Sequence, residues 1–152
     1  MEVVKSILSD EQRGCDGLKV MVIAEGDLQE FLVNQFLDLN CKVYVAKSEE
    51  DAIQKLRFHS FHIVVLQENL YLQAMQILQS FSMNIRRYMF SVFVGSLVET
   101  FNTMQAYVLS CNLVINIQDL QSFKDLLTNA VNENKTFYRA YNYTLENHYQ
   151  KG

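Results

Sequence analysis

Five short apolar runs alternate along the chain with longer segments of helical spacing, and this alternation restricts the possible folds more than any other feature. The clearest run is IVVL at residues 63–66. Strands that are apolar at successive positions are typical of parallel sheets buried on both faces. Strands are predicted over residues 19–24, 42–46, 62–66, 90–94 and 113–115.

Each predicted strand is followed by a segment with helical periodicity. Asp27 and Glu30 have the spacing of a capping box, and Ser48 is predicted to cap the next helix. Further helices are predicted over residues 70–81, over residues 98–109 with Phe101, Met104 and Val108 facing inward, and from about Asp119 onward.

This alternation predicts an α/β fold: a doubly wound, five-stranded parallel sheet with helices on both faces. For a chain of this size, the flavodoxin-like strand order 2-1-3-4-5 is the natural choice. Ligands of such sheets collect outside the carboxyl ends of the strands. The residues that directly follow the strands are therefore the candidates for a functional site.

Composition limits the possible functions. The chain has 152 residues, of which 49% are hydrophobic, and a formal net charge of −4, as expected for one globular domain. An acidic chain without a basic face is a poor non-specific binder of nucleic acid. The sequence has no apolar run of about 18 residues and no signal-peptide pattern. We therefore expect a cytoplasmic protein with no nucleic-acid or membrane partner.

The sequence lacks the patterns of familiar enzyme classes. Its 3 cysteines form no CxxC pair, and its 3 histidines lack metal-ligand spacing. Neither a G-x-S-x-G string nor a glycine-rich phosphate cradle occurs. We expect a protein that is not an enzyme and that holds no metal and no cofactor.

Four segments in order resemble one family. They are KVMVIAEGD from residue 19, SEEDAIQKL from residue 48, HIVVLQENL from residue 62 and NLVINIQDLQSFKDLL from residue 112. Together they make residues 18–131 similar to the CheY-like receiver domain of bacterial two-component response regulators. Residues 1–17 are then expected to be a leader or linker, and residues 132–152 a C-terminal helical extension.

The resemblance implies a phosphoryl-transfer pocket at the strand ends. Two acids after the first strand hold magnesium, and an aspartate after the third strand accepts the phosphoryl group. A hydroxyl after the fourth strand and a lysine after the fifth bind the phosphoryl oxygens. In this chain these positions fall on Ala24 and Glu25, on Gln67, on Gly95 with Ser96 beside it, and on Asn116. A carboxamide is not a usable nucleophile, so the pocket is predicted to be degenerate.

Gln67 is expected to act as a hydrogen-bonding plug that meets Glu25 or Asn116. Glu68 is expected to point away from Gln67, because side chains alternate along a strand. The resemblance thus implies a phosphorylation-independent pseudo-receiver that serves as a protein-interaction or dimerisation module in bacterial signalling. The alternative is an atypical receiver that binds a cation or small ligand at Glu25, Ser96 and Asn116 and switches on it.

The helical pattern of the last segment continues beyond residue 131, through Phe137, Tyr138 and Tyr141. These aromatic residues either fold back on the domain or form an exposed extension for a partner protein or a second copy. Receiver domains often use the face of the fourth helix, fifth strand and fifth helix for such contacts. Tyr107, on the outward side of the helix predicted over residues 98–109, is the first candidate on that face.

Overall fold

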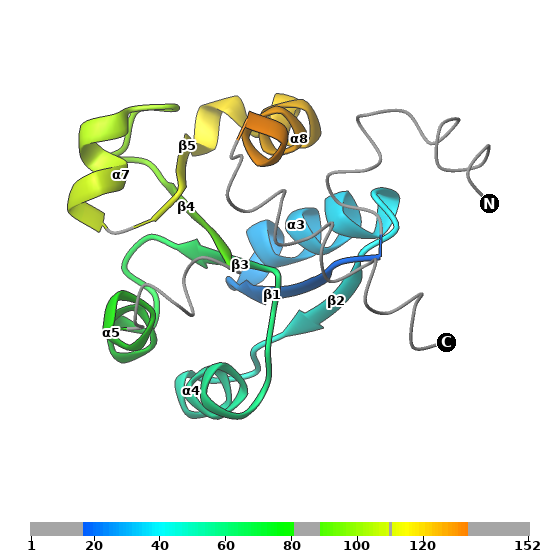
Figure 1. Cartoon of the computed structure of the whole chain (residues 1–152), viewed down its shortest axis with the longest axis vertical. Helices are drawn as coiled ribbons and strands as arrows, with labels where there is room; N and C mark the ends of the chain where they lie inside the picture. Colours follow the sequence, from blue (N-terminus) through cyan, green and yellow to red (C-terminus); the bar gives the residue numbers. More distant parts are fainter. Residues whose placement is uncertain (1–16, 81–88, 110, 134–152) are drawn as a thin grey trace.

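The computed structural model describes residues 17–80, 89–109 and 111–133 (Figure 1). In chain order the elements are β1 (Lys19–Ile23), α3 (Gly26–Asp38), β2 (Lys42–Val45), α4 (Glu49–Phe58), β3 (Ile63–Gln67), α5 (Leu72–Ser80), β4 (Phe90–Gly95), α7 (Thr103–Leu109), β5 (Leu113–Asn116), the 3-10 helix η1 (Ile117–Ser122) and α8 (Phe123–Glu133). Most of the predicted leader and C-terminal extension, including Phe137, Tyr138 and Tyr141, lies outside the described residues.

The five strands form one parallel sheet in the order β2-β1-β3-β4-β5. The predicted fold class and strand order are therefore confirmed. Side chains on both faces of the central strands are fully buried, as Met21 and Val22 in β1 and Val64 and Val65 in β3 show. This two-sided burial explains why the strands read as unbroken apolar runs.

Helices cover both faces of the sheet (Figure 1). On one face, α3 and α8 pack together through Phe36 and Phe123, whose ring centroids are 5.4 Å apart in an edge-to-face arrangement. On the other face, α4, α5 and α7 cover the sheet through side chains such as Leu56 and Leu78. Burying each such side chain contributes about 1.5–3 kcal/mol. Within the described residues, no helix has the length and apolar character needed to cross a membrane.

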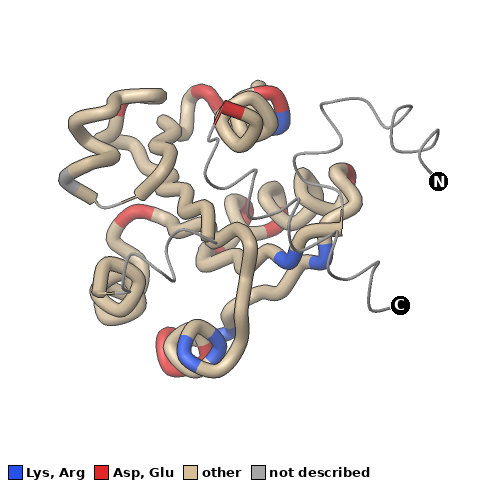
Figure 2. The backbone as a smooth tube through the Cα atoms, viewed as in Figure 1, with Lys and Arg blue, Asp and Glu red and all other residues tan. Residues whose placement is uncertain are grey.

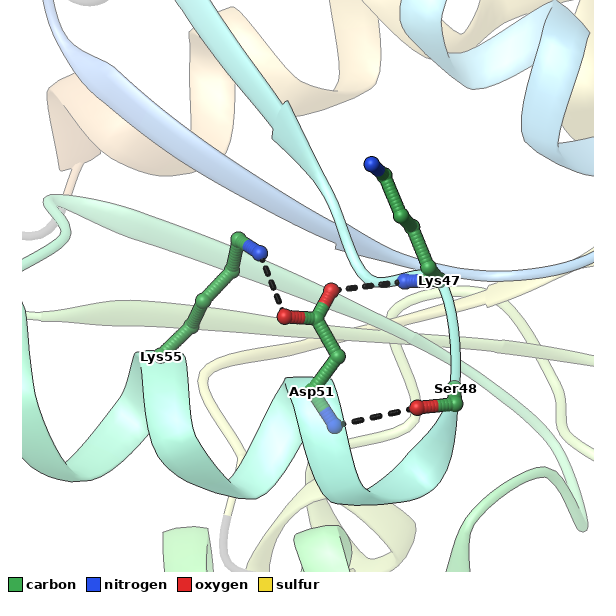
Figure 3. Close-up of polar contacts among 4 residues, drawn as sticks. All are labelled: Lys47, Ser48, Asp51 and Lys55. Carbon is green, nitrogen blue, oxygen red and sulfur yellow. Dashed lines mark hydrogen bonds and ion pairs between the residues drawn. The ribbon is translucent and has the colours of Figure 1, made fainter.

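Helix α4 begins after Ser48, as the sequence predicted. The Ser48 Oγ accepts a hydrogen bond from the Asp51 N–H at 3.1 Å. The Asp51 carboxylate in turn accepts bonds from the Lys47 N–H at 2.9 Å and the Lys55 Nζ at 2.6 Å (Figure 3). These bonds, led by the one from the Lys47 amide, lower the pKa of Asp51 below its ordinary value. The turn from β2 into α4 is thus fixed by local contacts.

The predicted capping box of Asp27 and Glu30 is wrong. Helix α3 begins at Gly26, and Glu25 at the cap position makes no side-chain capping bond. Gly26 has a φ of 62°, a conformation that glycine adopts without steric cost. The chain therefore turns directly after β1, and Asp27 lies in the first turn, where a negative charge is favourable.

Helix α7 begins directly after Asn102 and not at residue 98. The Asn102 Oδ1 accepts a bond from the Gln105 N–H at 2.8 Å and so caps the helix. Phe101 has a φ of 64°, a left-handed conformation in which a helix cannot continue. Phe101 and Met104, both predicted to face inward, are exposed. The side chain of Val108 lies outside the described residues.

His62, directly before β3, makes the stability of the fold sensitive to acid. Its Nδ1 accepts a hydrogen bond from the Lys19 N–H at 3.0 Å, which requires the neutral ring. Burial, followed by the charge of Lys19, lowers the pKa of His62 below the ordinary 6.5. The unfolded chain therefore takes up a proton at a pH where the folded chain does not. This contribution to the free energy of unfolding is present above about pH 6.5 and is lost as the pH falls toward the lowered pKa.

We predict that His62→Gln flattens the fall in the free energy of unfolding between about pH 7 and pH 5. Urea unfolding curves at several pH values measure this slope. His59→Gln is the matched control, because His59 is an exposed ring next to the same strand, and it should leave the slope unchanged. An identical slope in wild type and His62→Gln would contradict the assignment.

Candidate functional site

The candidate site lies at the carboxyl edge of the sheet. The strand register places Gln67 beside Val94 and Gly95 beside Asn116. Glu25 follows β1 at the same edge, because the parallel pairing of β1 with β3 ends at Ile23 beside Leu66, one residue before Gln67. Ala24 is 2% exposed and belongs to the core, so it contributes no polar atom to the site. The structure thus brings the other predicted pocket positions to one edge.

Gln67 joins the end of β3 to the end of β1. Its Oε1 accepts a hydrogen bond from the Glu25 N–H at 2.9 Å. The expected contact with Glu25 is confirmed, whereas no hydrogen bond between Gln67 and Asn116 occurs among the described residues. A neutral amide can occupy this half-buried position at much lower cost than a carboxylate.

Glu68 contacts the loop that follows β4, which the sequence did not predict. Its Oε2 accepts hydrogen bonds from the Ser96 N–H at 2.8 Å and the Ser96 Oγ at 3.1 Å. Strand alternation does not apply to Glu68, because β3 ends at Gln67. The one available signal was the glycine at position 95, which leaves room for a long side chain from β3.

Asn116 ends β5 and caps η1. Its Oδ1 accepts a bond from the Gln118 N–H at 2.8 Å, and its Nδ2 donates to the Val98 carbonyl at 2.7 Å. The last helix was predicted to begin near Asp119, but η1 occupies that position and α8 begins at Phe123. The side chain that replaces the lysine of the resembled family is thus fully engaged within the chain.

Segment 96–101, between β4 and α7, is anchored from two strands. On the β3 side, Glu68 holds Ser96. On the β5 side, the Asn116 N–H donates to the Thr100 Oγ1 at 2.8 Å, and the Thr100 hydroxyl donates to the Asp119 carboxylate. These bonds engage Ser96, Thr100 and Asn116 within the chain.

The ends of β3, β4 and β5 carry acids without cations. Residues 58–123 contain no lysine or arginine within the part of the chain that the structure describes. Positive charge lies instead on α4, at Lys47 between β2 and α4, near the starts of β1 and β2, and on α8 (Figure 2). A phosphoryl group carries nearly two negative charges at neutral pH. Among the described residues, it would find no compensating side chain at the ends of β3, β4 and β5.

Comparison of the sequence with models of protein families, and with curated proteins, gives no match. Solved structures do match. The receiver domain of the Francisella response regulator 1452 is 14% identical, with a TM-score of 0.59, covering 77% of this chain and 98% of that chain.

Two further structures extend the likeness. A receiver domain of a sensor histidine kinase from Pseudomonas aeruginosa, with magnesium coordinated in its active-site cleft, is 9% identical, with a TM-score of 0.58, covering 76% of this chain and 98% of that one. The Saccharomyces cerevisiae receiver domain of Ssk1, crystallised with Ypd1, is 13% identical, with a TM-score of 0.57, covering 74% of this chain and 88% of that one. This chain therefore has the receiver fold.

The residues at the carboxyl edge do not fit the magnesium ion that receiver folds imply. Glu25 is the one carboxylate at the end of β1, beside the apolar Ala24. The amide oxygen of Gln67 already accepts a bond from Glu25, and Glu68 is engaged by Ser96. No group of three metal-ligating side chains occurs among the described residues. Magnesium requires several well-placed oxygen ligands, and this donor set does not supply them.

We predict that Asn116→Ala lowers the free energy of unfolding by about 1–3 kcal/mol, because it removes a helix cap and leaves the Val98 carbonyl without its donor. Chemical denaturation measures the change. In Gln118→Ala, the backbone N–H that Asn116 caps is retained, so this control should differ from wild type by less than about 0.5 kcal/mol. Equal stability of wild type and Asn116→Ala would show that the cap is dispensable.

Proposed function

We propose that this chain is a non-catalytic, phosphorylation-independent receiver-like domain that acts by binding a protein partner or a second copy of itself. The setting that this proposal implies is cytoplasmic signalling or regulation of the bacterial two-component kind. A receiver domain can bind another protein directly, as the co-crystal of Ssk1 and Ypd1 illustrates for that pair.

The observation that carries the proposal is a set of exposed apolar side chains on α7 and the loop before it. We call this set the α7 apolar surface; its members and their exposed fractions are Leu97 78%, Phe101 49%, Met104 69% and Tyr107 81%. Met104 and Tyr107 are three residues apart on a helix and so lie on one face. Single exposed apolar residues need no explanation, but several within one short segment favour an interaction site.

The neighbouring elements extend this surface. A hollow of about 250 Å³ lies between α7, β5 and α8, lined by residues that include Phe101, Ala106, Leu113, Ala130 and Glu133. Phe101 therefore belongs both to the α7 apolar surface and to the hollow. The predicted face of fourth helix, fifth strand and fifth helix corresponds to α7, β5 and α8 (Figure 1).

Independence from phosphorylation is supported by the pocket. The acceptor position holds an amide that is bonded to Glu25, and the Ser96 hydroxyl is bonded to Glu68. Of the three groups suggested for the alternative of a ligand-switched receiver, Ser96 and Asn116 likewise have partners within the chain, and Glu25 offers a single carboxylate. No observation therefore favours that alternative.

We predict that incubation with acetyl phosphate and Mg²⁺ adds no phosphoryl group, as measured by intact mass. Titration with beryllofluoride and Mg²⁺ should leave the amide chemical shifts of Glu25, Gln67 and Ser96 unchanged. Gln67→Asp should also remain unmodified, because it restores neither the second acid at Ala24 nor the cation at Asn116. Saturable shifts around Gln67 in the wild type would refute the proposed independence.

We predict that the wild-type protein self-associates as its concentration rises, or that it captures a partner from its own cell, and that Tyr107→Asp abolishes this binding. A charge in a desolvated interface is strongly unfavourable. Sedimentation velocity measures the association. Phe58→Asp is the matched control, because Phe58 is 78% exposed on α4, away from the α7 apolar surface, and it should associate normally. Equal association of wild type and Tyr107→Asp would remove α7 from the interface.

A further inference from the structure

We propose that Glu68 is a built-in anion that permanently occupies the position at the end of β4 where a receiver would bind a phosphoryl oxygen. In doing so it holds segment 96–101, which bears half of the α7 apolar surface, in one conformation. The role of Glu68 at Ser96 stands on geometry alone, and its consequence for binding rests on the proposed function.

The first support is the convergence of two donors on one oxygen. The Ser96 N–H and the Ser96 hydroxyl both donate to Glu68 Oε2, at 2.8 Å and 3.1 Å. Bonds to an ionised acceptor are stronger than those between neutral groups. Ser96 thus forms a small anion site, and a carboxylate of the same chain fills it.

The second support is Gly95. A Cβ atom added at position 95 would lie 2.7 Å from Glu68 Oε2 and 2.8 Å from Glu68 Cβ. The φ of Gly95 lies outside the left-handed region, so the backbone alone does not require glycine. The missing side chain makes room for Glu68. The loss of the family's hydroxyl at position 95 and the engagement of Glu68 are therefore two parts of one arrangement.

The third support is that segment 96–101 is held at three of its residues. Ser96 is held by Glu68, Val98 is buried, and Thr100 is held by Asn116. Leu97 and Phe101, which belong to the α7 apolar surface, lie between or beside these anchors. The bonds of Glu68 to Ser96 are the only side-chain hydrogen bonds that join the turn after β3 to this segment among the described residues.

The chemistry of this site specifies its ligand class. The two donors are neutral, and the described part of residues 58–123 contains no lysine or arginine. They therefore suit a single carboxylate, whereas a phosphoryl group would need a cation to balance its second charge. Once Glu68 is truncated, the vacated space at Gly95 should accept a small carboxylate from solution. Acetate is the probe of choice, and inorganic phosphate tests the preference.

The experiment follows the backbone amide resonance of Ser96 by two-dimensional NMR. In Glu68→Ala we expect this resonance to move upfield, together with those of Leu97 and Phe101, as the charge-assisted bond is lost. Added acetate should return it toward the wild-type position in a saturable manner, and phosphate should do so more weakly. Acetate should leave the wild-type spectrum unchanged, because Glu68 already occupies the site.

Two variants make the test specific. Gly95→Ala keeps the carboxylate but displaces it, so it should move the Ser96 resonance as Glu68→Ala does, without rescue by acetate. Glu25→Ala removes the exposed carboxylate at the end of β1; both Ser96 donors bond to Glu68, so this variant should leave the Ser96 resonance in place. If Glu68→Ala fails to fold, Glu68→Gln keeps the shape of the side chain and should still lose part of the downfield shift.

Three outcomes would overturn the proposal: an unchanged Ser96 resonance in Glu68→Ala, equal movement in Glu25→Ala, or an acetate response of equal size in the wild type.

Sedimentation of the same variants separates this inference from the proposed function. A rescued Ser96 resonance without any association in the wild type would retain the role of Glu68 and remove the interface. Association that is identical in wild type and Glu68→Ala would show that the anchor does not control the surface.

Discussion

The burial of both sheet faces is the constraint on which the remaining structure depends. The side chains of residues 20–23 in β1 and 63–65 in β3 have no exposed surface on either face. A polar group there would lose its hydration without gaining a partner. Polar side chains are therefore confined to the strand ends, where loops supply free donors and acceptors. The carboxyl edge is the place where Gln67, Glu68 and Asn116 can all be satisfied.

The parts of the fold that the sequence predicted are those governed by local or periodic features. The apolar runs predicted the strands. Ser48 predicted the start of α4, because its capping bond to the Asp51 N–H spans only three residues. The start of α7 was misplaced because it depends on Phe101, whose left-handed conformation is supported by a bond from its N–H to the Val114 carbonyl. No pattern within residues 98–109 reveals a contact with β5.

The candidate site divides in the same way. The resemblance located the pocket positions, and the chemistry of an amide suggested that Gln67 would bond to Glu25. The role of Glu68 was missed because its partner, Ser96, is 28 positions away and because the turn after β3 sets its direction. A long-range contact of a single side chain produces no periodic pattern in the sequence. The sequence feature that accompanies the contact of Glu68 with Ser96 is Gly95 on the neighbouring strand β4.

The packing of Glu68 against Gly95 also bears on how such a chain can change over generations. A serine or threonine introduced at position 95 meets the Glu68 side chain, since even a Cβ comes within 2.8 Å of Glu68 Cβ. A small residue introduced first at position 68 leaves the donors of Ser96 without their acceptor. Each of these two substitutions is therefore unfavourable until the other has occurred. Positions 68 and 95 are therefore coupled, and related sequences should keep glutamate and glycine as a pair or exchange both.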